Sequence, residues 1–230
     1  MTTRSLAGRT WLEVRAAILS PLVFATITLV VTVLHRDRFH FGADSENAMF
    51  AAWGWLVVYI VVPIVGWTLV ALQWRVACTD RPRQHALPRS MEMTITAHGV
   101  VLAVLGVALL IVPLEVATYW PWALSELTGR AVGAWLVGIS VAVLASASHD
   151  RKVLVPGLGS GLAFGVLQII ALARFSTDRV PETGQWVVDW SEPSAAVYLL
   201  FLVSFVVTSC LALFQSRAKT SIHQPAVDSI

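Results

Sequence analysis

The sequence predicts an all-α integral membrane protein, a bundle of six transmembrane helices arranged as three hairpins with both termini in the cytoplasm. The first observation behind this is composition. Of 230 residues, 57% are hydrophobic and only 13% are charged, whereas a soluble domain carries about 25% charged residues. The second is patterning, because the apolar residues fall into six long stretches with nearly all charges in the gaps. The third is the uneven distribution of Lys and Arg between alternate gaps, which indicates an orientation.

Each of the six apolar stretches is close to the length of a membrane-crossing helix, which is about 20 residues. We expect them to span the membrane over residues 16–34, 48–72, 95–119, 131–146, 153–175 and 195–214. Because the spans and their connections occupy most of the chain, we expect a single membrane domain over 1–230 that ends in a polar cytoplasmic tail at 215–230. The charged segment 35–38 follows the first stretch where a signal peptide would have small residues, so we expect this stretch to be retained as a helix.

Positive charge orients a multi-pass protein, because cytoplasmic loops carry an excess of Lys and Arg. With the N-terminus inside, eleven of the sixteen Lys and Arg residues fall in inside segments and five fall outside. The gap between the second and third stretches alone holds four Arg residues. Both termini are therefore predicted to be cytoplasmic, and each successive pair of spans is predicted to turn on the outside.

Small residues line one face of the fifth predicted span. Gly157, Gly161 and Gly165 recur there at four-residue spacing, and such a face lets another helix approach closely. Ala134 and Gly138 offer a shorter version in the fourth span. Because the connection between these two spans is short, we predict that they are antiparallel neighbours in tight contact through these residues.

Glu115 is the candidate for chemistry inside the membrane. It lies about one turn from the outer end of the third predicted span, after Pro113, which should kink that helix. A charge at the bilayer centre costs about 2.5–3.5 kcal/mol on insertion scales and less near the interface. One interpretation is a proton acceptor or a contact for a substrate cation in an outward-facing cavity. The alternative is a carboxylate that reaches the interface or pairs with Arg130 or Arg174.

Aromatic residues are concentrated in the predicted outer half. Trp120 and Trp122 follow directly after the third span, and seven of the ten Trp residues lie on this side. Aromatic belts normally occur at both membrane faces, so the excess favours a vestibule for an apolar or lipid ligand, with a simple belt as the alternative. Three placements are open for segment 185–190 of the last outer loop. It lies flat on the membrane, it folds over the vestibule, or it stays in solvent. The predicted ligand-binding residues are Glu115, Trp120, Trp122, Arg130 and Arg174.

No cofactor or metal site is predicted. Of the six His residues only His98 lies within a predicted span, and a membrane-embedded haem needs two that face each other. Cys78 and Cys210 are far apart and lack the spacing of a redox pair. The middle of every span lacks Asp, Glu, Lys and Arg, which disfavours an ion pump, and a net charge of +2 does not favour nucleic acid. The expected partners are membrane lipids and another membrane protein.

Short segments resemble a family of multi-pass membrane proteins from actinobacteria. The segment 120–130, which begins Trp120-Pro121-Trp122, carries the resemblance together with 134–136, and the segments 38–41 and 55–63 are also similar to that family. The likeness extends over most of the chain. It implies a bacterial plasma membrane, and it implies no activity and no catalytic residue.

Three functions are compatible with this pattern. The first is a non-catalytic interaction or accessory component that binds lipid in its outer half, because packing motifs are present and buried reactive groups are not evident. The second is a small-molecule transporter or permease that uses Glu115 and the aromatic vestibule. The third is an enzyme on a lipid-linked substrate, with Glu115 and Glu126 as its acids, which would have to converge on one reacting atom.

Overall fold

The computed structural model describes residues 11–39, 41–42, 45–74, 87–147, 151–179 and 187–221. This part of the chain is helical and contains no β-strand. The long helices are α1 (Trp11–Leu34), α2 (Glu46–Trp74), α3 (Arg89–Ile111), α5 (Glu126–Ala147), α6 (Arg151–Phe175) and α7 (Pro193–Ser221). Two short elements complete the set, the 3-10 helix η1 (Arg36–Arg38) after α1 and α4 (Pro113–Ala117) after α3.

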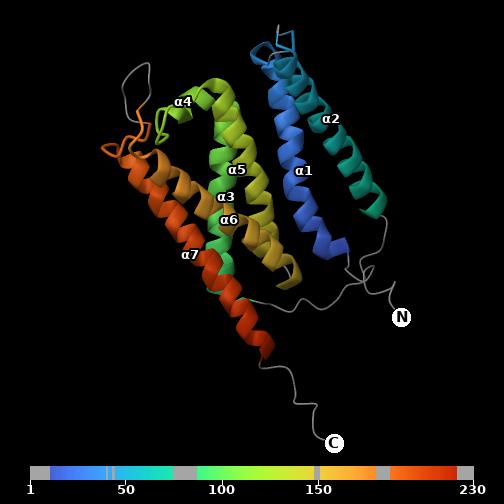
Figure 1. The fold of residues 1–230 in the computed structure, drawn as a ribbon. Helices are drawn as coiled ribbons and strands as arrows, with labels where there is room; N and C mark the ends of the chain where they lie inside the picture. Colours follow the sequence, from blue (N-terminus) through green and yellow to red (C-terminus); the bar gives the residue numbers. More distant parts are fainter. Residues whose placement is uncertain are drawn as a thin grey trace, which may run out of the picture.

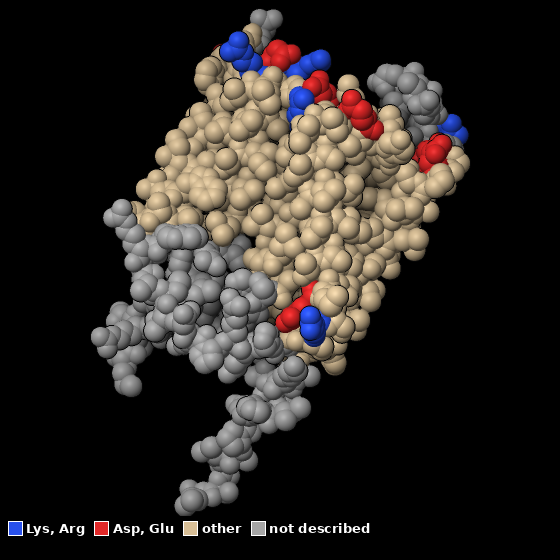
Figure 2. Space-filling model, turned by 180° about the vertical axis from the view of Figure 1, so that it is seen from behind, with Lys and Arg blue, Asp and Glu red and all other residues tan. Residues whose placement is uncertain are grey.

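The long helices form three antiparallel pairs, α1 with α2, α3 with α5, and α6 with α7 (Figure 1). The connections within the three pairs all lie at one end of the bundle, which we call the turn end. Five helices are long and apolar enough to cross a membrane, and α1 adds a shorter apolar stretch, Ile18–Leu34. Charged side chains on the face shown in Figure 2 gather at its two ends, with an uncharged band between them. The prediction of an all-helical bundle with several helices able to span a membrane is confirmed.

The third predicted span, 95–119, is not one helix. Helix α3 begins earlier, at Arg89, and ends at Ile111, and Val112 then leaves the helical conformation with φ −126° and ψ 62°. Pro113 has no N–H to donate and occupies the first position of α4, where a proline is tolerated. The proline therefore ends the helix, where the sequence predicted only a kink. At the other end of the chain, α7 continues to Ser221, so the predicted polar tail at 215–230 begins within a helix.

Helix α5 lies at the centre of the bundle and packs against α3, α1 and α6. More than half of its apolar segment is buried (56%), compared with 11% for α2, whose main contact among the described helices is with α1. Its tightest contact is with α3, at a point where a glycine of each helix lies at the helix crossing. A Cβ added to Gly133 would stand 2.7 Å from the Gly106 carbonyl oxygen, and one added to Gly106 would stand 2.9 Å from the Gly133 oxygen. The two backbones are in contact here, so neither position has room for a side chain.

The predicted contact between α5 and α6 is present, but the small residues are used differently. Gly157 faces α5, where an added Cβ would collide with the Ser146 hydroxyl oxygen. Gly161 and Gly165 approach α7 most closely, since their added Cβ atoms would lie 2.7 Å from side chains of that helix, Phe205 and Val206. The glycine face of α6 therefore serves two neighbours, α5 near its start and α7 further along.

The prediction that Gly138 packs against α6 is wrong. Its added Cβ would lie 2.9 Å from the Cβ of Phe24 on α1. Ala134 is fully buried on the same helix (0% exposed). The cause is the position of α5, which is surrounded by three helices, so that small residues on its different faces meet different partners.

Indole hydrogen bonds join α1 to α2. The Nε1–H of Trp55 donates to the hydroxyl of Thr32 at 3.2 Å, and that of Trp67 donates to the hydroxyl of Thr26 at 3.0 Å. In an apolar environment such bonds between helices contribute about 0.6 kcal/mol each on average. They help to hold α2 against α1 on the outside of the bundle.

Candidate functional site: an apolar groove closed by aromatic rings

A groove of about 800 Å³ runs between α1, α5 and α6. Sites for small molecules typically measure about 300–1,000 Å³. Along α6 its wall extends from Pro156 to Gln168, which is about 18 Å at the helical rise of about 1.5 Å per residue. Leu167 and Trp135 line the groove and yet are 63% and 54% exposed. The groove therefore opens on the side of the bundle, between the helix ends.

Three aromatic rings close the groove at the turn end. Trp120 and Trp122 lie in the connection between α4 and α5, and Tyr198 lies in the second turn of α7. The centroids of the three rings are 5.4–5.5 Å from one another, within the range of favourable edge-to-face contacts. We refer to these residues as the aromatic triad. The sequence predicted the two tryptophans as a pair, and the structure adds Tyr198 from a helix more than seventy residues later.

The connection before α7 supports the triad from outside. Val188 is 3% exposed and belongs to an apolar cluster against which Trp122 packs. The N–H of Asp189 donates to the carbonyl of Pro121 at 3.4 Å. Ser191 donates both its hydroxyl and its N–H to the Asp189 carboxylate, which lowers the pKa of that carboxyl. In the predicted loop segment 185–190, Val187 and Val188 thus pack in the cluster that includes Trp122 and Tyr198, whereas Trp190 is exposed; Gln185 and Trp186 lie outside the described residues.

Most polar side chains along the groove are already satisfied by the backbone. Ser20 donates to the carbonyl of Gly138 at 2.7 Å, and Ser160 donates to the carbonyl of Gly157 at 2.8 Å. The lining residues include no Asp, Glu, Lys, Arg, His or Cys. The groove is therefore an apolar surface whose remaining polar groups lie near the triad.

Two donors near the triad are not satisfied in this way. The indole Nε1–H of Trp120 is buried and has no acceptor among the described residues. The Tyr198 hydroxyl donates to Oε1 of Gln168 at 3.3 Å, which leaves the amide N–H groups of Gln168 without an acceptor in the described part of the chain. Gln168 is the only Asn or Gln inside the six predicted spans, a signal that could have identified it.

A second, smaller hollow of about 200 Å³ lies on the other side of the triad, between α3, α4 and α7. Trp120, Tyr198, Phe164 and Leu136 border both spaces. These four side chains therefore form a wall between the groove and the smaller hollow.

The charged candidates lie apart from the groove. Glu115 is exposed on α4, and its carboxylate forms no ion pair with any described residue. Arg174, at the end of α6, pairs with Asp178 at 3.3 Å and is 68% exposed. Neither of them lines the groove, and neither does Arg130. Of the five predicted ligand-binding residues, the structure brings only Trp120 and Trp122 together.

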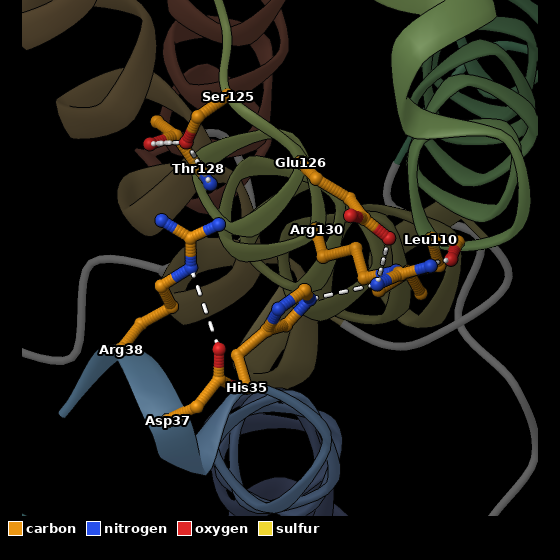
Figure 3. A network of polar contacts seen from close by, with 8 residues as sticks. All are labelled: His35, Asp37, Arg38, Leu110, Ser125, Glu126, Thr128 and Arg130. Carbon is orange, nitrogen blue, oxygen red and sulfur yellow. Dashed lines mark hydrogen bonds and ion pairs between the residues drawn. The ribbon is translucent and has the colours of Figure 1, made fainter.

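Arg130 instead joins three helices at the turn end (Figure 3). Its Nη1 donates to the Glu126 carboxylate one turn earlier on α5 and to Nε2 of His35, each at 2.7 Å. Its Nε donates to the carbonyl of Leu110 at 3.2 Å, in the last turn of α3, where helix carbonyls lack partners. Nearby, the Ser125 hydroxyl accepts from the N–H of Thr128 at 3.2 Å, which caps the start of α5.

Comparisons with protein-family models, with curated proteins and with solved structures find no match for the chain. The resemblance of segment 120–130 to an actinobacterial family stays a prediction. The function is accordingly inferred from the groove and the contacts around it.

Proposed function

We propose that the chain is a non-catalytic, multi-pass component of a bacterial plasma membrane that binds a lipid in the groove between α1, α5 and α6. In this proposal the helices cross the membrane six times, both termini are cytoplasmic, and the turn end faces outward. The observation that carries the proposal is the groove itself, which is apolar, of ligand size and open on the side of the bundle. In a membrane, the molecules that meet such an opening are lipids.

The position of the groove supports lipid as the ligand. The exposed lining residues Trp135 and Leu167 belong to the predicted spans 131–146 and 153–175, so the opening would face the hydrocarbon layer. That layer is about 30 Å thick, and the groove extends over about 18 Å of α6. The groove is thus somewhat longer than one leaflet of hydrocarbon, and a single acyl chain would fit along it.

The composition of the groove supports a binding role over a catalytic one. General acid–base catalysis needs a titratable side chain within hydrogen-bond reach of the reacting atom, and the lining offers only the Tyr198 phenol. The two acids proposed for an enzyme do not converge, since Glu126 pairs with Arg130 whereas Glu115 stands exposed on α4. The same exposure of Glu115, away from the groove, weakens the support for a permease that uses it.

A groove-filling substitution tests the proposal. Ala163 lines the groove and is exposed on α6, so the ring of Ala163→Phe can enter the groove without displacing buried side chains. We expect this variant to retain roughly tenfold less lipid than the parent protein, which corresponds to about 1.4 kcal/mol. The measurement is native mass spectrometry of protein extracted gently with its own lipids.

Ala173→Phe is the matched control, because Ala173 is exposed on the same helix and does not line the groove. The parent protein and this control are expected to carry the same lipid mass. Equal retention by Ala163→Phe, or release of all lipid by the parent protein under gentle extraction, would contradict lipid binding in the groove.

A further inference from the structure

Among the Ser, Tyr and Gln side chains that line the groove, unused hydrogen-bond donors remain at one end. Ser20 and Ser160 donate to backbone carbonyls. At the triad end, by contrast, the amide N–H groups of Gln168 are unused within the described chain, since the hydrogen bond of Gln168 to Tyr198 goes through Oε1. The Nε1–H of Trp120 also lacks an acceptor among the described residues, but this nitrogen is enclosed by protein atoms and does not face the groove. The groove therefore has a long apolar part and, near the triad, an amide donor from Gln168.

This polarity specifies what the end can bind. An amide N–H without an acceptor in an apolar environment is destabilising, and it is stabilised when an acceptor oxygen is placed against it. The amide of Gln168 can donate to a neutral carbonyl oxygen, and the lining carries no charge that would attract a phosphate or an ammonium group. The complementary ligand atom is consequently an uncharged acceptor next to a long apolar chain.

We infer that the groove selects a lipid through its acyl ester (or amide) carbonyl, which accepts a hydrogen bond from Gln168 while the acyl chain runs along α6 toward Pro156. This inference rests on the proposed lipid-binding function and specifies its ligand class. The geometry agrees with the position of such carbonyls in a bilayer, at the boundary between headgroups and hydrocarbon. The triad lies at the turn end, where the charged side chains of the bundle begin.

The test compares two lipids that differ only in this group. One is a diacyl phospholipid, and the other is the dialkyl ether analogue with the same headgroup and chain length, which lacks the carbonyl oxygens. Delipidated protein is reconstituted with each, and affinity is measured by native mass spectrometry in competition. We expect the parent protein to prefer the ester lipid by roughly three- to tenfold, the range of one net hydrogen bond.

A variant then tests the donor. Gln168→Leu removes the amide and is expected to bring the ester preference close to one while leaving affinity for the ether lipid unchanged. Trp190→Phe is the control, because Trp190 is 44% exposed and outside the groove; it should retain the preference of the parent protein.

The outcomes separate this inference from the proposed function. If the parent protein binds both lipids equally, or if Gln168→Leu keeps the full ester preference, carbonyl recognition by Gln168 is wrong while lipid binding stands. If the parent protein binds neither lipid, the proposed function itself fails. Binding of the ether analogue in each variant also shows that the variant has folded with an intact groove, so a lost preference is not a consequence of unfolding.

Discussion

Replacing Gly133 with alanine is expected to lower the free energy of unfolding by about 1–3 kcal/mol, the usual cost of forcing extra atoms into a packed core. The physical reason is that the new methyl group would stand 2.7 Å from the Gly106 carbonyl oxygen. This atom belongs to the backbone of α3, so it cannot rotate away as a flexible side chain would. Helices α3 and α5 would have to separate, and the hydrophobic cluster that contains Leu109 and Leu136 would open with them.

The measurement is denaturant unfolding in detergent micelles, followed by tryptophan fluorescence and helical circular dichroism. Gly54→Ala is the matched control, because an added Cβ at Gly54 meets nothing within 4 Å. Alanine is the better helix former by about 0.8–1.0 kcal/mol, so the control should be unchanged or more stable. Opposite signs for the two substitutions are the expected result. Equal stability of Gly133→Ala and Gly54→Ala would show that the helices do not touch at this crossing.

The helical spans could be predicted from the sequence because the membrane leaves few alternatives. A long apolar stretch without charges must satisfy its own backbone in lipid, and a helix does so. The stretches predicted at 48–72 and 153–175 therefore agree with α2 and α6 to within about two residues at each end. The exception is the span 95–119, where Pro113 divides the apolar stretch. Apolar content does not show whether a proline bends a helix or ends it, since that depends on the packing around the break.

Helix partners could not be predicted in the same way. Glycine spacing indicated a close face on α6, but it did not show that Gly161 and Gly165 would meet α7. The crossing of Gly106 with Gly133 was missed, although Gly129 and Gly133 stand at four-residue spacing on α5 and Gly99 and Gly106 lie seven residues apart on α3, because such spacing does not show which helices meet. Such a contact depends on the crossing point of two helices, which is a property of the whole bundle.

The candidate site was predicted only in part, because only some of its residues are neighbours in the sequence. Trp120 and Trp122 are neighbours in sequence, so their aromatic cluster was visible. Tyr198 and Gln168 reach it from α7 and α6 only after the chain has turned back twice. Arg130 was interpreted as a ligand contact because it is a basic residue near the predicted outer face; in the structure its Nε and Nη1 are engaged with protein acceptors.

Replacing Arg130 with alanine is the second substitution with a large expected effect, a loss of about 2–3 kcal/mol in the free energy of unfolding. The side chain is only 20% exposed and donates to Glu126, His35 and the Leu110 carbonyl. Hydrogen bonds to a charged group contribute about 1.5–3 kcal/mol, and removing the donor leaves its acceptors unpaired. The loss should fall on the contact of α1 with α3 and α5, because these acceptors come from the ends of α1 and α3 and from α5.

Arg174→Ala provides the comparison that isolates this effect. Arg174 also pairs with an acidic residue four positions away, Asp178, but at 3.3 Å and with 68% of its side chain exposed. Exposed ion pairs contribute about 0.2–1 kcal/mol. Arg174→Ala should therefore lower the free energy of unfolding by less than about 1 kcal/mol in the same denaturant experiment. Arg130→Lys should restore little of the stability lost in Arg130→Ala, because a single ammonium lacks the planar fork that reaches several acceptors at once. If Arg130→Ala and Arg174→Ala cost the same, or if lysine substitutes fully at position 130, charge alone matters there and the three-helix contact contributes nothing.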